Sequence, residues 1–141
     1  MNTTTVNDVI SKSKWIKQPI NKVWKAITDN EQVSQWLVPT NFKAEVGFEY
    51  FLQDPKKECN VVTGKVLEAD PYTLVYTWIN EAANTVETIV RWELKEENGG
   101  TTLEMTHSGI SKYSTDLQAG MTESYTSGWK RCFENIGNLL N

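Results

Sequence analysis

The sequence predicts an α+β fold in which a curved antiparallel sheet of about six strands holds a long C-terminal helix. Three observations predict it. Apolar and polar side chains alternate through several segments between residues 42 and 107, which is typical of half-buried antiparallel strands. Two short segments of helical period precede that region, and a long one follows it. Such a sheet has one apolar face, and the last helix is the element available to cover it.

The N-terminal third predicts one strand and two short helices. Residues 1–8 are mostly polar and are expected to be flexible, which leaves residues 9–141 as one domain. Residues 9–18 carry β-branched and aromatic side chains typical of a strand. A helix is expected over residues 20–27, because apolar residues recur there at steps of three and four after a proline. A second helix follows, with Asp29 or Asn30 as its cap.

The rest of the chain predicts five strands and the long helix. Asp70-Pro71 indicates a turn, and Asn98-Gly99-Gly100 indicates a hairpin. The helix begins between Ser114 and Thr122, and Gly128 lies on or near its apolar face, where it permits close approach or leaves space. The five expected strands are 42–53, 61–69, 74–78, 86–94 and 102–107.

Composition argues against several function classes. Eighteen acidic and fourteen basic residues give a net charge of −4, which is not the basic footprint of a nucleic-acid-binding domain. No stretch approaches the roughly 18 apolar residues that span a bilayer. The N-terminus does not resemble a signal peptide, so we expect a cytoplasmic protein with free thiols at Cys59 and Cys132. A disulfide between them stays open.

Charge is unevenly distributed. Segment 12–25 holds five lysines and no acidic residue, at positions Lys12, Lys14, Lys17, Lys22 and Lys25. Two readings are open. The segment is either a docking surface for an acidic protein partner or an ordinary solvated face.

The search for catalytic chemistry finds little. The chain has one histidine, no paired-cysteine motif and no nucleotide-binding or nucleophile motif, so we expect no metal and no cofactor and assign no catalytic residue. His107 shares a strand face with Leu103 and Met105 and is expected to point inward. It is a general base, a hydrogen-bond donor to a ligand, or a structural histidine.

Aromatic residues supply the candidate binding site. Six tryptophans are spread over nearly all predicted elements, and at least four of them are expected to meet in a shared interior. That interior is either a filled core or a pocket with apolar walls and a few polar anchors. The candidate ligand-binding residues are Trp36, Phe48, Tyr50, Tyr76, Trp78, Trp92, Met105, His107, Trp129 and Phe133.

Five segments in order resemble one family. They are PINKVWKAITDNEQVSQWLVP at 19–39, LVYTW at 74–78, VRWEL at 90–94, GGTTLEMTHSGI at 99–110 and SGWKRCFENIGNLL at 127–140. They are similar to the activator of heat-shock-protein-90 ATPase homologue family of the START-like (SRPBCC) superfamily. The resemblance implies a helix-grip fold and a stand-alone bacterial-type domain, without the chaperone-docking domain of eukaryotic activators.

We therefore expect a small-molecule binding protein. An apolar or aromatic ligand would lie between the sheet and the C-terminal helix, oriented by Tyr50, Tyr76 or His107. One alternative is a cyclase- or aromatase-like enzyme, as some START-like relatives are, with His107 as the acid or base. Another is a protein-interaction module, such as a chaperone co-factor, that binds through segment 12–25. We favour binding over catalysis, and the oligomeric state stays open.

Overall fold

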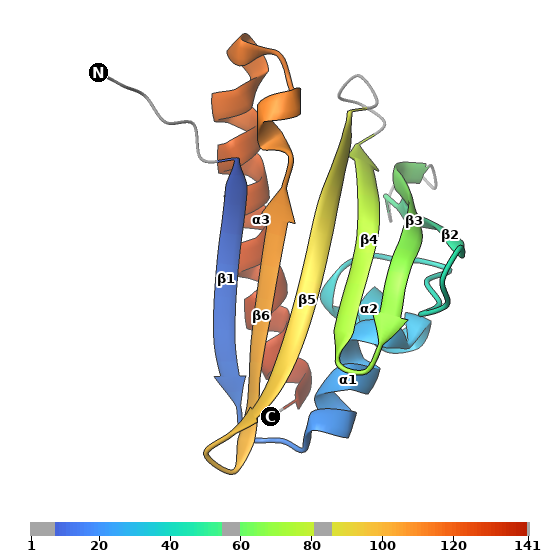
Figure 1. The fold of residues 1–141 in the computed structure, drawn as a ribbon, viewed down its shortest axis with the longest axis vertical. Coiled ribbons are helices and arrows are strands. Elements are labelled where there is room, and N and C mark those ends of the chain that lie inside the picture. Colours follow the sequence, from blue (N-terminus) through green and yellow to red (C-terminus); the bar gives the residue numbers. More distant parts are fainter. Residues whose placement is uncertain (1–7, 55–59, 81–85, 141) are drawn as a thin grey trace.

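Six strands form one antiparallel sheet in the order β1-β6-β5-β4-β3-β2, and the long helix α3 packs against it (Figure 1). The computed structural model describes residues 8–54, 60–80 and 86–140. The elements are β1 (Val9–Ile16), α1 (Ile20–Thr28), α2 (Asn30–Trp36), β2 (Glu49–Gln53), β3 (Asn60–Asp70), β4 (Thr73–Asn80), β5 (Glu87–Glu97), β6 (Gly100–Ser108), a short 3-10 helix η1 (Ile110–Lys112) and α3 (Thr115–Leu140). The α+β helix-grip architecture expected from the sequence is confirmed.

Local sequence explains the connections. Asn98 and Gly99 both have positive φ angles, 50° and 78°, which is the conformation of the two-residue turn that joins β5 to β6. The carboxylate of Asp29 accepts a hydrogen bond from the Gln32 backbone N–H at 3.3 Å and so caps α2. The expected hairpin and one of the two expected caps are thus confirmed.

One expected strand is shorter than its alternation predicts. Residues 42–48 form a loop, and only Glu49–Gln53 pairs with β3. Gly47 has a φ of 90°, and the Phe48 N–H donates to the Glu45 carbonyl at 2.9 Å, so the chain turns here. Val46, at the centre of that turn, is 67% exposed. A turn at Gly47 interrupts the expected strand although the alternation of apolar residues continues through it. Apolar periodicity alone therefore does not reveal the turn.

The first strand and the last helix close the structure. β1 pairs with β6 along its whole length, although the two strands lie at opposite ends of the sequence. Figure 1 shows α3 running along the same part of the sheet, and α1 and α2 lying toward β4. The amide of Gln18 donates to the carbonyl of Leu140 at 2.6 Å, and Asn135 donates to the carbonyl of Trp36 at 3.4 Å. The first contact holds the segment after β1 against the end of α3, and the second holds the end of α2 against α3.

Candidate functional site

Four tryptophans meet between the sheet and α3, as the sequence predicts. The ring centroids are 5.6 Å apart for Trp36 and Trp92, 5.8 Å for Trp92 and Trp129, and 5.3 Å for Trp78 and Trp129. Phe133 stacks on Trp92 at an interplanar angle of 13°. Rings from α2, β4, β5 and α3 therefore form one continuous cluster, and each of these five side chains is buried.

His107 lies at the base of this cluster and is fully buried. The indole N–H of Trp129 donates to its Nδ1 at 3.0 Å, so Nδ1 carries no proton. The neutral ring therefore carries its proton on Nε2, which donates to the Thr88 hydroxyl at 2.7 Å. That hydroxyl donates in turn to the Trp78 carbonyl at 2.9 Å. We use the name packed interior for the side chains that form this series of hydrogen bonds and those packed against them. They are Thr88, Trp92, Met105, His107 and Trp129.

These bonds define what His107 can do. Burial lowers the pKa of His107 to about 4, so the ring is neutral at neutral pH. Both ring nitrogens are already engaged, and neither is exposed to bind a substrate proton. The arrangement favours the structural interpretation of this histidine over the catalytic one.

The two inward tyrosines also have protein partners. The Tyr50 hydroxyl donates to the Thr77 carbonyl at 2.5 Å, and the Tyr76 hydroxyl accepts from the Trp92 indole at 2.9 Å. Burial raises the pKa of both phenols, so both stay protonated. The two rings contact each other edge to face, with centroids 5.3 Å apart. Each of the two hydroxyl oxygens thus has a protein partner, Tyr50 as a donor and Tyr76 as an acceptor.

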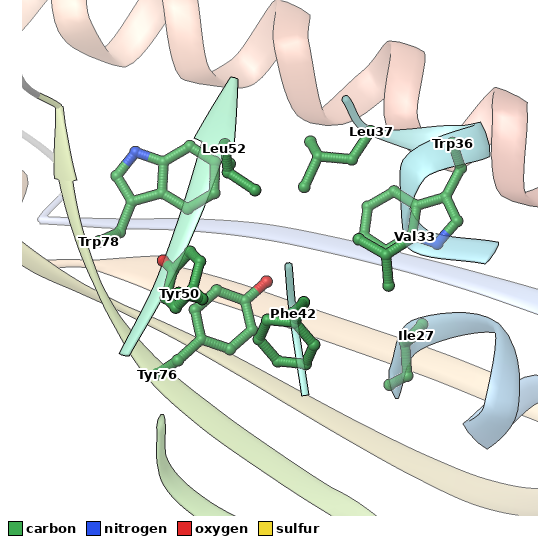
Figure 2. A pocket seen from close by; sticks show the side chains of 9 residues that line it. All are labelled: Ile27, Val33, Trp36, Leu37, Phe42, Tyr50, Leu52, Tyr76 and Trp78. Atoms are coloured by element: carbon green, nitrogen blue, oxygen red, sulfur yellow. The ribbon is translucent and has the colours of Figure 1, made fainter. Parts of the chain in front are cut away.

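The space left inside is very small. A cavity of about 10 Å³ remains beside the tyrosines, which is near the lower limit for one water molecule. Figure 2 shows its walls, formed by Ile27, Val33, Trp36, Leu37, Phe42, Tyr50, Leu52, Tyr76 and Trp78. The space that α1 and α2 enclose against strands β2 and β4 is thus nearly filled.

A much larger space opens next to it. A groove of about 630 Å³ lies between the middle of α3, the segment that follows α2, and strands β3 and β4. It is open to solvent at its rim. Its lining is Leu37, Val38, Asp54, Val61, Trp78, Ser124, Tyr125, Gly128, Trp129, Arg131 and Cys132. We call this the groove.

Two side chains belong to both spaces. Leu37 and Trp78 line the small cavity and also the groove, so together they form the wall between them. Trp78 is 7% exposed, and its indole nitrogen has no hydrogen-bond partner among the described residues. An unpaired buried donor is unusual, since most buried polar groups are hydrogen-bonded. This N–H is a buried polar group of the wall that has no partner in the described part of the chain.

The predicted site residues separate into groups. Trp36, Tyr50 and Tyr76 line the cavity, Trp129 lines the groove, and Trp78 lines both. Four others, Trp92, Met105, His107 and Phe133, are buried and line neither space. Phe48 is half-buried in the loop before β2 and also lines neither.

Sequence reasoning missed most of the groove. The predicted site residues include only Trp78 and Trp129 of the groove lining, and the sequence leaves both close approach and open space possible at Gly128. A Cβ added at Gly128 would have no heavy atom within 4 Å, so this glycine leaves space. The helical stripe that includes Tyr125, Trp129 and Cys132 was the available signal.

Other chemistry finds little support in the described residues. Among them, no group of three His, Cys, Asp or Glu residues is arranged to hold a metal ion. Cys132 is a free buried thiol, and burial raises its pKa to about 12. Cys59 lies outside the described residues. No helix among the described segments is long and apolar enough to cross a membrane.

The fold and groove define a helix-grip domain with an open cleft beside its C-terminal helix. Residues 17–141 match the family described as Activator of Hsp90 ATPase homolog 1-like protein. The chain belongs to this family of ligand-binding helix-grip proteins within the START-like group.

Solved structures agree with this assignment. Protein MLL2253 from Mesorhizobium loti is 27% identical, with a TM-score of 0.83 over 94% of this chain and 96% of that one. Protein BH1534 from Bacillus halodurans is 26% identical, with a TM-score of 0.76 and the same coverage, 94% and 96%. CalU16 from Micromonospora echinospora shares the fold at 22% identity, with a TM-score of 0.69 over 91% of this chain and 75% of that one. The sequence matches none of the curated proteins with which it was compared.

Proposed function

We propose that this protein binds a small apolar ligand with an aromatic ring in the groove beside α3. One observation carries the proposal, namely a groove of about 630 Å³ with aromatic and aliphatic walls. Ligand sites for small molecules typically have volumes of roughly 300–1,000 Å³ and mostly apolar linings with few polar groups. The groove fits that description, whereas the cavity of about 10 Å³ between the short helices and strands β2 and β4 has no room for a ligand.

The expected affinity is modest. Burial of about 250 Å² of apolar ligand surface would contribute roughly 6 kcal/mol at 25 cal/mol per Å². Association costs several kcal/mol of translational and rotational freedom, which offsets part of this gain. We therefore expect a dissociation constant of about 0.1 millimolar or weaker for a simple two-ring probe.

Binding is favoured over catalysis by the same geometry. His107 is the only histidine of the chain, and its two ring nitrogens are both hydrogen-bonded within the packed interior. The groove itself offers a carboxylate at Asp54 and a guanidinium at Arg131, both on its lining. The lining thus contains no histidine to transfer a proton near neutral pH.

Filling the groove with a larger side chain tests directly whether a ligand binds there. N-phenyl-1-naphthylamine, a neutral probe whose fluorescence rises in apolar surroundings, should bind the wild-type protein. Gly128→Leu places a side chain in the open space of the groove and should weaken binding at least fivefold. Gly120→Leu is the matched control, because Gly120 is an exposed α3 glycine with equally open surroundings and lies outside the groove.

The outcomes are distinct. Saturable binding that Gly128→Leu weakens and Gly120→Leu preserves supports the groove as the site. If the wild-type protein does not bind the probe, or if both variants bind it equally well, the proposed function loses its basis.

A further inference from the structure

We propose that the groove selects a flat apolar ligand carrying one neutral hydrogen-bond acceptor, such as the carbonyl of an aryl ketone, and that Trp78 donates its indole N–H to this acceptor. The inference rests on the proposed function, since it specifies the ligand of the same groove. It is carried by an unpaired donor in the groove wall, by the residues that separate groove from cavity, and by the charges of the lining.

Among the described residues, Trp78 has the one buried indole N–H without a hydrogen-bond partner. The indole N–H groups of Trp15, Trp36, Trp92 and Trp129 each donate to a protein acceptor, at 2.8, 2.8, 2.9 and 3.0 Å. Trp78 is 7% exposed, and its N–H has no acceptor among the described residues. A buried donor without a partner costs free energy that a correctly placed ligand acceptor would recover. A ligand acceptor placed at this N–H would therefore gain binding free energy.

The direction of the donor favours the groove. In Figure 2 the nitrogen lies on the edge of the indole that is turned away from Tyr50 and Tyr76. The tyrosine side of the wall is also occupied, because both phenol oxygens have protein partners there. The groove is the other space that Trp78 lines.

Access to the nitrogen requires a small movement. The nitrogen atom is almost fully shielded from solvent, and Leu37 shares the wall with Trp78. Leu37 is half-buried and immediately follows the last residue of α2. In Figure 2 the nitrogen lies on the edge of the indole farther from Leu37, so a ligand in the groove reaches the N–H only after side chains at that edge move aside.

The chemistry of the lining favours a neutral acceptor over a charged one. Asp54 and Arg131 both line the groove and have opposite signs, so neither charge alone defines the ligand. The buried nitrogen lies in a largely aromatic and aliphatic wall, where an anion would lose its hydration for a single hydrogen bond. Open space beside Gly128, next to the Trp129 ring, gives a flat ring system room to lie against α3.

A pair of isosteric probes tests the inference. 2-Acetonaphthone carries a carbonyl oxygen, and 2-isopropenylnaphthalene has a CH₂ group in the same place. Replacing Trp78 with 3-benzothienylalanine removes the N–H and keeps the ring volume. This variant should bind the ketone about three- to tenfold more weakly and bind the hydrocarbon unchanged. Trp78→Phe also removes ring volume from the groove wall, so it should weaken binding of both probes, and of the ketone more strongly.

The matched control lies on α3. The same replacement at Trp129 removes an N–H that is already committed to His107, so any effect should be equal for the two probes. A second readout is the indole N–H signal in a ¹H–¹⁵N spectrum, assigned by its absence in Trp78→Phe. The ketone should move this signal downfield, and the hydrocarbon should not.

Each result decides between the two proposals. If both probes bind and the replacement at Trp78 changes them equally, the acceptor inference is wrong and the groove remains a binding site. If neither probe binds, the inference also fails, and the proposed function depends on the naphthylamine titration alone. If 2-naphthoate binds more tightly than the ketone and Arg131→Gln removes that preference, charge at the rim selects the ligand and the inference is overturned.

Discussion

The packed interior and the groove adjoin each other, but they satisfy their polar groups in opposite ways. In the packed interior, Trp129, His107 and Thr88 pass hydrogen bonds in sequence to a backbone carbonyl. In the groove wall, the indole of Trp78 has no partner among the described residues, although its ring centroid is only 5.3 Å from that of Trp129. The same side-chain type thus serves stability in one place and leaves a donor available in the other. Placement of the acceptor, not residue type, makes the difference.

The largest expected effect is on the pH dependence of the packed interior. The pKa of His107 is about 4 in the folded protein, against an ordinary value of 6.5. The unfolded chain therefore binds more protons between those pH values, and stability falls as pH falls from about 6.5 to about 4. The loss should total roughly 3 kcal/mol. Denaturant unfolding at a series of pH values measures it.

His107→Gln is the control for this window. Glutamine can accept from Trp129 and donate to Thr88 but does not titrate. Because the chain has one histidine, the variant should flatten the stability profile above about pH 5, where carboxylates contribute little. An unchanged slope in the variant would show that His107 does not titrate as its burial requires.

A smaller effect should separate the two tryptophans. Trp129→Phe removes ring volume and also leaves the Nδ1 of His107 without its donor, whereas Trp78→Phe removes ring volume alone. The first variant should be less stable than the second by about 1–3 kcal/mol, the cost of an unsatisfied buried group. Thermal or denaturant unfolding of the two proteins gives the comparison. Equal losses would mean that the two indole N–H groups do not differ as described.

The smallest effect concerns the groove side of α3. Gly128→Ala should raise stability by about 1 kcal/mol, because alanine is the better helix former and the added methyl group meets no atom within 4 Å. Gly120→Ala should give a similar gain for the same reason. Only the first variant narrows the groove, so only it should weaken binding of the naphthylamine probe. A drop in unfolding temperature for Gly128→Ala would show that the space is occupied.

Sequence patterns predicted the fold better than the site. Alternation in β5 and β6 and the stripe in α3 are local signals that appear as alternating or one-sided burial in the structure, because the sheet has one covered face. In β4, by contrast, residues 74–78 are all buried. The same signal failed at 42–48, where Gly47 turns the chain despite continuing alternation. Local periodicity does not encode such a turn.

The site depends on contacts that no local pattern contains. The meeting of four tryptophans could be predicted, because each lies on an inward face of its own element. Which of these tryptophans belong to the core and which line the groove could not be predicted. The indole of Trp129 finds an acceptor because the tertiary structure brings His107 to it, whereas no described residue brings one to the indole of Trp78. These are properties of the assembled tertiary structure.

The pairing of β1 with β6 has a consequence for synthesis of the protein. Ile10 pairs with His107, so the first strand must wait for almost the whole chain before it finds its partner. The helix that covers the apolar face of the sheet begins only at Thr115. A nascent chain shorter than that leaves this face exposed, and long-range strand pairing of this kind is slow. Folding of this domain should therefore be completed only after α3 has been synthesised, when the Gln18 amide can reach the Leu140 carbonyl.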